Sequence, residues 1–334
     1  MFNNIYEKIK SFIKNNYKEI LVYLIILFVL TFELPYYIYV GGGTIDLESR
    51  IDLKSNEKGS YNLAYVSQIN ATLPTYLLSF FIDSWEVIEV GDITIDDSET
   101  KSDVDKREKL YLEEANNNAI INAYSLAGKS IDIKSSYYKV VYVNEESDTD
   151  IKVGDTLISV NGISVRDNNE YKEYLKSLEI GTNLDVVVKR EDKEVNCYAK
   201  LISVDGEKVI GLYLVNIIDY KVEPEINLKF KWNESGPSGG FMLSLAIYDK
   251  LIEDDLTKGR KIVGTGTIDM NGNVGEIGGV KYKLIGAVKD KADIFFVPTD
   301  NYEEAINTKN KYKYDIEVIE VKTLQDAIDY LKAN

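Results

Sequence analysis

The chain has 334 residues, with 55 acidic side chains against 39 basic ones, a formal net charge of −16, one cysteine and no histidine. The lack of imidazole excludes Ser-His-Asp and Cys-His nucleophiles and every histidine-ligated metal site. Hydrolytic chemistry would have to use carboxylates, lysine, serine, threonine or tyrosine. The acidic excess also argues against nucleic acid as a partner, because affinity for phosphates comes from lysine and arginine.

The first predicted element is an apolar segment near the N-terminus. Residues 1–18 hold four lysines against one glutamate, a local charge of +3 that leaves −19 for the remainder. Residues 20–40 carry a single charge, at Glu33, and about 20 such residues cross a membrane as a helix. We therefore predict a transmembrane anchor at 19–40, with a cleaved signal peptide as the alternative. The lysines predict a single-pass cell-membrane protein with a cytoplasmic N-terminal tail and extracellular C-terminal domains.

The following block, residues 41–135, is predicted to be an α/β segment that packs with the C-terminal domain. Strand-like runs are followed by an acidic stretch at 92–108, which is typical of a solvated loop. From residue 108 to 127 apolar side chains recur at helical spacing, and Gly128 supplies the stop. We therefore expect a helix that begins near residue 108.

Short β-runs dominate residues 136–205. The phrase GDTLISVNGISV contains the tight-turn signal Asn161-Gly162 and has a strand before it and a helix after it. It resembles PDZ domains, which add an extended peptide to a sheet edge. The resemblance implies a PDZ-like domain at 136–205. The glycine-rich loop that holds a peptide carboxylate in that family is not visible around residues 137–142, which argues against binding of free C-termini.

The last block, residues 206–334, alternates predicted strands and helices, and we interpret it as α+β. One phrase, residues 234–240, reads Glu-Ser-Gly-Pro-Ser-Gly-Gly and precedes an apolar helix. A serine at a helix N-terminus lies among free N–H groups, the setting of a nucleophile beside an oxyanion site. By itself the phrase is also typical of a plain turn.

A second phrase in this block opens a helix with a glycine pair and two lysines, Lys281 and Lys283. A desolvated lysine whose pKa falls from about 10.4 toward 7 or 8 can replace histidine as a general base. Two solvated lysines are the structural alternative.

Together the two phrases resemble, almost continuously from Gly236 to Ala287, the proteolytic domain of the Lon (S16) peptidases. The matching phrases are GPSGGFMLSLAIYDKL, GTGTIDMNGNVGEIGGVKYK and the ensuing IFFVP. With the predicted anchor and PDZ-like domain, the chain resembles the membrane-anchored PDZ–Lon serine proteases of Gram-positive bacteria. The resemblance implies an α+β fold with an N-terminal transmembrane helix and a PDZ-like domain embedded before a C-terminal Lon-type proteolytic domain at 206–334.

The resemblance also implies roles for three residues. Ser238 matches the family nucleophile, Lys283 matches the base of its Ser-Lys dyad, and Thr265 matches a threonine that supports the lysine amine. Periodicity alone places Lys281 slightly nearer the apolar side of the helix, so the choice between the two lysines rests on the motif. For Thr265, a β-branched strand residue is the structural alternative.

The predicted function is that of a membrane-anchored, ATP-independent, extracytoplasmic serine endopeptidase. No GxxxxGK[ST] phosphate loop occurs in the chain, so the expected substrates are small or flexible peptides and proteins, with the PDZ-like domain as a docking site. No cofactor and no metal are expected. The alternative is a non-catalytic PDZ-containing membrane scaffold or binding protein.

Overall fold

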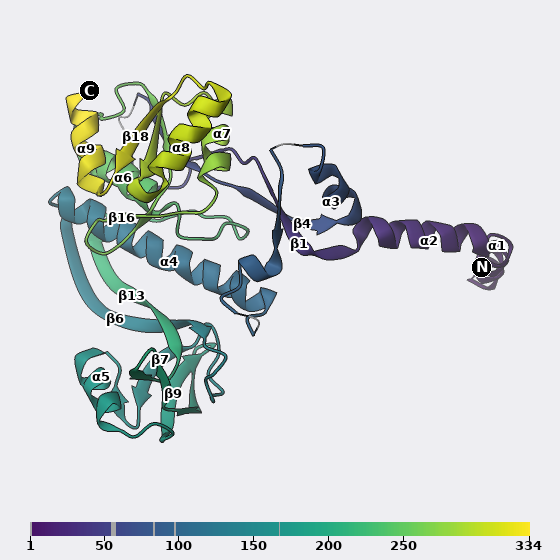
Figure 1. The fold of residues 1–334 in the computed structure, drawn as a ribbon, viewed down its shortest axis with the longest axis horizontal. Helices are drawn as coiled ribbons and strands as arrows, with labels where there is room; N and C mark the ends of the chain where they lie inside the picture. The colour runs from purple at the N-terminus through teal and green to yellow at the C-terminus, as the bar shows by residue number, and fades with distance from the viewer. Residues whose placement is uncertain (1, 55–57, 83, 97, 167) are drawn as a thin grey trace. The chain divides into compact units, whose positions relative to one another are not determined.

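The computed structural model describes residues 2–54, 58–82, 84–96, 98–166 and 168–334 (Figure 1). Contacts within the chain divide it into two compact units. Unit one combines residues 1–41 with 67–93, and unit two combines residues 42–66 with 94–334.

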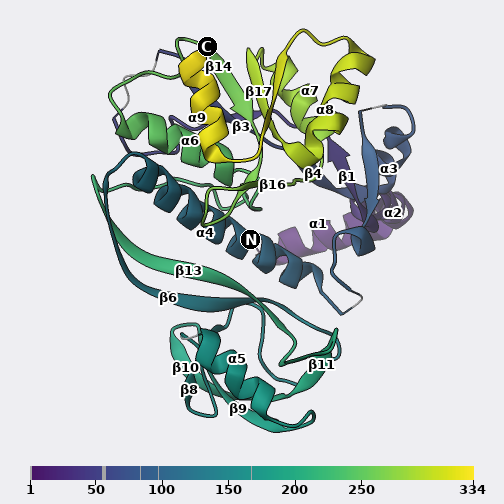
Figure 2. The ribbon, with the colours of Figure 1, turned by 60° about the vertical axis from the view of Figure 1, so that its left-hand side comes forward.

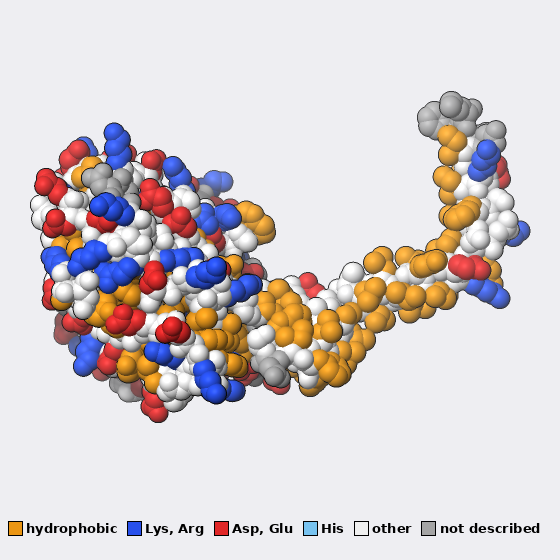
Figure 3. Space-filling model, turned by 90° about the horizontal axis from the view of Figure 1, so that it is seen from above, with side chains coloured by type: hydrophobic (Ala, Val, Ile, Leu, Met, Phe, Trp, Pro, Cys, Tyr) orange, Lys and Arg blue, Asp and Glu red, His pale blue; other side chains and the backbone are white. Residues whose placement is uncertain are grey.

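Unit one contains N-terminal helices and a three-stranded antiparallel sheet with the order β4-β1-β5. Its elements are α1 (Phe2–Asn15), α2 (Tyr17–Thr31), β1 (Glu33–Val40), β4 (Ser67–Thr72), α3 (Leu73–Ser79), β5 (Glu86–Glu89) and the 3-10 helix η1 (Val90–Asp92). Tyr37 and Ile38 of the central strand are buried. No residue of α2 is buried, and Figure 3 shows apolar side chains on its surface.

The prediction of a transmembrane helix at residues 19–40 is wrong. α2 ends at Thr31, and the residues from Glu33 to Val40 form β1. Pro35 disfavours a helix interior, while the aromatic and β-branched residues after it favour a strand. A helix of 15 residues is about 22 Å long, shorter than the roughly 30 Å hydrocarbon core of a bilayer.

Among the described residues, none of the helices has both the length and the apolar character needed to cross a membrane. This finding overturns the predicted anchor. It also overturns the predicted location as a single-pass cell-membrane protein with a cytoplasmic N-terminus and extracellular C-terminal domains.

The larger core of unit two surrounds a five-stranded sheet with the order β18-β17-β14-β3-β2. Its strands are β2 (Thr44–Asp46), β3 (Ser60–Ala64), β14 (Lys261–Gly264), β17 (Ile294–Pro298) and β18 (Glu317–Val321). All neighbours in this sheet are parallel except β2 and β3. Parallel strands need crossover connections, which helices supply here.

Helices lie on both faces of this sheet (Figure 2). α6 (Gly240–Leu251) and α9 (Leu324–Ala333) share a core with Phe296 of β17, whereas α7 (Val280–Lys289) and α8 (Thr299–Tyr312) share a core with its neighbour Phe295. Successive side chains of a strand point to opposite faces of the sheet, so Phe295 and Phe296 pack against the helices on opposite faces. The fold class is therefore mixed α/β. The expected class, α+β with an N-terminal transmembrane helix, is wrong.

A second sheet of unit two has the order β10-β9-β7-β6-β13, with β8 paired to β7. Its strands are β6 (Ser130–Val143), β7 (Thr156–Val160), β8 (Ile163–Ser164), β9 (Asn183–Arg190), β10 (Lys193–Lys200) and β13 (Leu212–Glu223). α5 (Asn168–Ser177) packs on it through Leu175. Two small pairs, β11 (Ile202–Val204) with β12 (Glu207–Val209) and β15 (Thr267–Ile268) with β16 (Val274–Gly275), complete the unit.

The long helix α4 (Lys101–Leu126) connects the elements of unit two. It begins seven residues earlier than expected, because Thr100 caps it by accepting a hydrogen bond from the Asp103 N–H at 3.2 Å. The helix packs against α6 and against β6 and β13.

Side chains of α4 also cover part of the edge strand β13. Glu114 Oε1 accepts from the Asn216 N–H at 3.2 Å, and the Asn117 amide accepts from the Ile218 N–H at 2.8 Å and donates to its carbonyl at 3.0 Å. Burial raises the pKa of the Glu114 carboxyl, although the hydrogen bond from Asn216 opposes the rise. The backbone groups of Asn216 and Ile218 in β13 are thus hydrogen-bonded to side chains of α4.

Candidate active site

Ser238 lies in the turn that leads into α6, and backbone hydrogen bonds fix the turn within itself and to the segment around Gly266. The Gly240 N–H donates to the Pro237 carbonyl at 3.1 Å, and the Gly266 N–H donates to the Ser238 carbonyl at 2.8 Å. Within the described residues, the N–H groups of Ser238 and Gly239 donate to no protein acceptor. They are free donors at the positive end of a buried helix, where a developing oxyanion is stabilised.

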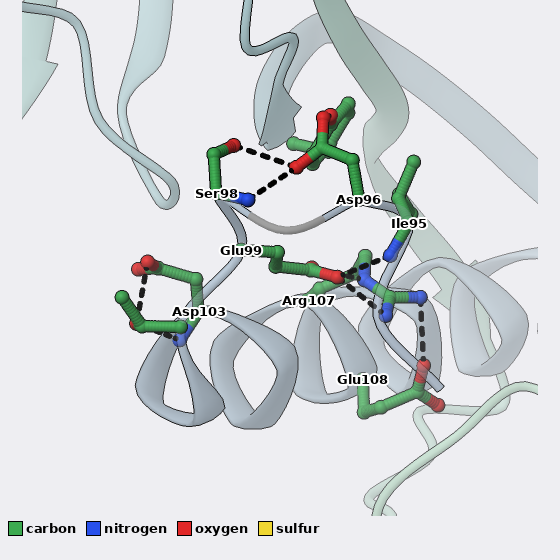
Figure 4. Close-up of polar contacts among 9 residues, drawn as sticks. Ile95, Asp96, Ser98, Glu99, Asp103, Arg107 and Glu108 are labelled. Carbon is green, nitrogen blue, oxygen red and sulfur yellow. Dashed lines mark hydrogen bonds and ion pairs between the residues drawn. The ribbon is translucent and has the colours of Figure 1, made fainter. Parts of the chain in front are cut away.

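The N-terminal half of α4 supports this turn, and Figure 4 shows the contacts that Arg107 of this helix makes with Glu99 and Glu108. The Gly236 N–H donates to the Glu108 carbonyl at 2.9 Å, and Gly236 has a φ of +88°, which favours glycine. Arg107 donates to Glu99 through Nε at 2.7 Å and Nη2 at 3.1 Å, and to Glu108 through Nη1 at 3.3 Å. Burial raises the pKa of the Glu108 carboxyl, while the charge of Arg107 opposes that rise.

Lys283 is buried in α7, with only 4% of its surface exposed. Its Nζ donates to Thr265 Oγ1 at 3.1 Å. Burial lowers the pKa of Lys283 from 10.5 to about 7, because a low-dielectric surrounding disfavours the charged ammonium. At neutral pH a large fraction of the amine is therefore unprotonated and able to accept a proton.

Lys281 has a different environment on the same helix. It is only half-buried, and its Nζ lies 4.9 Å from the centre of the Tyr282 ring. The periodicity of the sequence places Lys281 slightly nearer the apolar side of the helix, whereas in the structure Lys283 is the buried lysine. Gly286 lies one turn after Lys283, and a Cβ there would come within 3.2 Å of the Gly43 backbone. The chain segment before β2 thus covers a side of α7 that has no apolar side chain there.

Thr265 connects the predicted nucleophile and the predicted base. It is fully buried, and its Oγ1 donates to the Ser238 carbonyl at 3.0 Å while accepting from Lys283. Its own N–H donates to the Phe296 carbonyl of β17 at 3.1 Å. The structure thus brings together all three residues singled out in the sequence.

Other residues around the site carry no recognisable motif. Asn118 and Asn122 of α4 are buried, and their amides donate to the carbonyls of Ile268 at 3.1 Å and Asp269 at 2.8 Å. These bonds hold the strand that follows Thr265. Sequence analysis missed them, and the signal was a run of asparagines in the half of the helix that carries no charged side chain, residues 115–126.

The chemistry available at this site is nucleophilic. It combines a serine hydroxyl, free backbone donors at a helix N-terminus and a buried amine with a pKa of about 7, which are the parts of an acyl-transfer site. Within the residues that the structure describes, no group of three or more cysteine, aspartate or glutamate side chains is arranged to hold a metal ion.

Comparison with known proteins points to the same class. Residues 232–333 match the model of the Lon protease (S16) C-terminal proteolytic domain. The Lon protease of Campylobacter jejuni is 30% identical over 125 residues, covering 33% of this chain and 15% of that protein. The Lon protease of Mesomycoplasma hyopneumoniae is 33% identical over 98 residues, covering 29% and 11%, and Lon protease 2 of Borreliella burgdorferi is 31% identical over 120 residues, covering 34% and 14%.

These matches show that residues 232–333 are similar to the proteolytic domain of the Lon (S16) proteases, and they support a serine peptidase. The chain spans only 11–15% of the length of the three relatives. A solved PDZ domain of an SdrC-like protein from Listeria monocytogenes is 24% identical, covering 25% of this chain and 93% of that structure, with a TM-score of 0.23. A likeness this limited does not establish a PDZ domain here.

Proposed function

We propose that this protein is an ATP-independent serine endopeptidase in which Ser238 is the nucleophile, Lys283 the general base and Thr265 the residue that orients the lysine. The observation that carries the proposal is the burial of Lys283 against Thr265, which in turn bonds to Ser238. A buried amine without a counter-charge destabilises a fold. Catalysis by a neutral amine offers a reason for its presence, and a purely structural binding module offers none.

The proposed reaction follows from the chemistry of these groups. Neutral Lys283 takes the proton from Ser238 Oγ, and the oxygen attacks a peptide carbonyl carbon. The N–H groups of Ser238 and Gly239 stabilise the oxyanion. Collapse breaks the C–N bond while the Lys283 ammonium returns its proton to the leaving amine. Lys283 then deprotonates a water, whose oxygen attacks the acyl carbon. Collapse breaks the ester bond to Ser238 Oγ, the Lys283 ammonium returns its proton to that oxygen, and the new carboxyl end is released.

ATP independence is supported by the absence of a GxxxxGK[ST] phosphate loop from the 334 residues. Without ATP-driven unfolding, the enzyme can act only on chains that already present an extended segment. We infer that its substrates are small or flexible peptides and proteins.

We further propose that residues 136–205 form a PDZ-like domain, with residues 206–334 as the proteolytic domain. Support comes from the strands β10-β9-β7-β6, which lie largely within residues 136–205 and form a sheet that α5 covers; β13, from the following block, is the edge strand of this sheet. Gly211, with a φ of +81°, lies immediately before β13, whereas residues 137–142 contain no glycine. An extended peptide that pairs with β13 before Asn216 would dock a substrate at this sheet edge.

The catalytic proposal is tested with the variants Ser238→Ala and Lys283→Ala on a flexible protein substrate and on a fluorogenic peptide. Both are expected to lose activity by roughly a thousandfold or more, because the two groups act as a unit. Lys281→Ala is the matched control and is expected to stay within about threefold of the parent, since it removes a lysine two positions away. Cleavage by both active-site variants at the parent rate would refute the assignment.

A further inference from the structure

The segment that leads into α7 is held by one side chain from a different helix. Asn301 lies in the first turn of α8 and is buried, with 4% of its surface exposed. Its Oδ1 accepts from the Ile277 N–H at 2.9 Å, and its Nδ2 donates to the Ile277 carbonyl at 2.9 Å. The amide thus pairs with both backbone groups of one residue, as a neighbouring strand would.

Ile277 lies three residues before the start of α7 at Val280, so this pairing acts directly on the helix that carries Lys283. Gly279 is the N-cap, with a φ of +69°, and its carbonyl accepts the Lys283 N–H at 3.1 Å. A Cβ on Gly279 would lie 2.9 Å from Val66, so the cap fits closely against its surroundings. A backbone fixed at Ile277 and Gly279 fixes the position at which Lys283 leaves the helix.

The amine of Lys283 requires this precision. Within the described part of the chain, its Nζ donates to Thr265 Oγ1 alone, at 3.1 Å, and a hydrogen bond weakens steeply with small changes in distance and angle. Acidic side chains of α8 near this end, Asp300 and Glu303, line a surface hollow together with Lys281 and not with Lys283. The effect of α8 on Lys283 is therefore carried by the backbone that Asn301 holds.

We propose that Asn301 is a positioning residue that sets the location of Lys283 by clamping the backbone of Ile277. This inference rests on the proposed function of Lys283 as the base. It assigns to Asn301 a role that no motif in the sequence indicates. Removing the amide would leave the Ile277 N–H and carbonyl buried without partners, and the start of α7 would shift until water reached them.

The test compares Asn301→Leu, which has a similar volume and no polar atom, with Asn301→Ser, which keeps one hydroxyl. Asn307→Leu is the matched control, because Asn307 is an exposed residue of the same helix. Two readouts are taken: the pH dependence of kcat and kcat/KM, and the titration of Lys283 by NMR of the 13Cε-labelled lysine in a Ser238→Ala background. The second readout does not depend on activity.

In Asn301→Leu we expect kcat to fall with little change in KM, and the titration of Lys283 to move upward from about 7. A rise of one pH unit would lower the neutral fraction of the amine at pH 6 about tenfold. The acid limb of the rate profile should move by the same amount. Asn301→Ser should show a smaller shift in the same direction, and it serves as the test if the leucine variant does not fold.

An unchanged Lys283 titration in folded Asn301 variants would overturn the inference, even if activity fell, because the side chain would then have only a structural role. An equal shift in Asn307→Leu would also overturn it. If the Lys283 titration moves but the acid limb does not follow it, the clamp is present and the assignment of Lys283 as the base fails instead. The two proposals are therefore distinguished by one data set.

Discussion

Replacing Lys283 by methionine reports on the buried amine without any measurement of activity. In the folded protein burial lowers the pKa of Lys283 from 10.5 to about 7, whereas the unfolded chain restores the ordinary value. Between these two pH values the unfolded chain binds one more proton than the folded one. The free energy of unfolding of the parent therefore rises with pH across this window. The destabilisation is fully present below pH 7 and is lost above pH 10.5.

The size of the effect follows from the same two pKa values. A shift of one pKa unit corresponds to about 1.4 kcal/mol. At pH 7 the buried amine destabilises the parent by about 4 kcal/mol, and at pH 9 by about 2 kcal/mol, relative to a state in which it is neutral throughout. Methionine has a similar length and no charge, so Lys283→Met should be more stable than the parent at pH 7. Its advantage should shrink by about 2 kcal/mol by pH 9.

The assay is urea unfolding at pH 7, 8 and 9, followed by circular dichroism. Loss of the hydrogen bond between Lys283 and Thr265 subtracts a nearly constant amount at every pH, so the change with pH is the diagnostic quantity. Lys281→Met provides the baseline for removing a half-buried lysine from the same helix. A stability difference between the parent and Lys283→Met that stays constant from pH 7 to pH 9 would refute the reasoning.

Two further variants test the surroundings of the nucleophile. Thr265→Val removes the hydroxyl that accepts from Lys283 and donates to the Ser238 carbonyl, and we expect kcat/KM to fall by about 10- to 100-fold. Thr265→Ser keeps a hydroxyl, and its kcat/KM should stay within a few-fold of the parent value. Equal rates for the two variants would contradict the bridging role of Thr265. Gly236→Ala forces a side chain into a φ of +88°, at about 1–2 kcal/mol of strain, and should lower kcat/KM. Gly181→Ala is the control, because Gly181 has a φ of +89° in the turn before β9. It should lower stability but not kcat/KM, and identical effects of the two variants on kcat/KM would contradict a specific role for the turn at Gly236.

The two phrases that contain Ser238 and Lys283 were visible in the sequence because both patterns are local. A glycine-rich turn before an apolar helix and a glycine pair before a lysine-bearing helix are visible without knowledge of distant contacts. The structure places Ser238, Thr265 and Lys283 in one connected group, although their roles remain a prediction until tested.

Distant contacts account for the errors. The apolar run after residue 19 has the length of an anchor, but β1 pairs with two strands from residues 67–89, and this pairing converts its second half from helix to strand. The acidic start of α4 was interpreted as a loop because the burial of Glu99 against Arg107 depends on the folded chain. Periodicity favoured Lys281 because Gly286, where a backbone packs, does not count as apolar. Asn301 gave no signal, because its partner lies 24 residues away.

The contacts between α4 and β13 have a consequence for aggregation and for the length of any docked chain. An edge strand with unpaired N–H and C=O groups is a template for pairing with a second chain. Glu114 and Asn117 already occupy the outward backbone groups at Asn216 and Ile218, so no foreign strand can extend past that point without displacing them. Before that point β13 offers residues 212–215, room for an added strand of about four residues. The helix that supports the nucleophile turn thereby also determines where an added strand must stop.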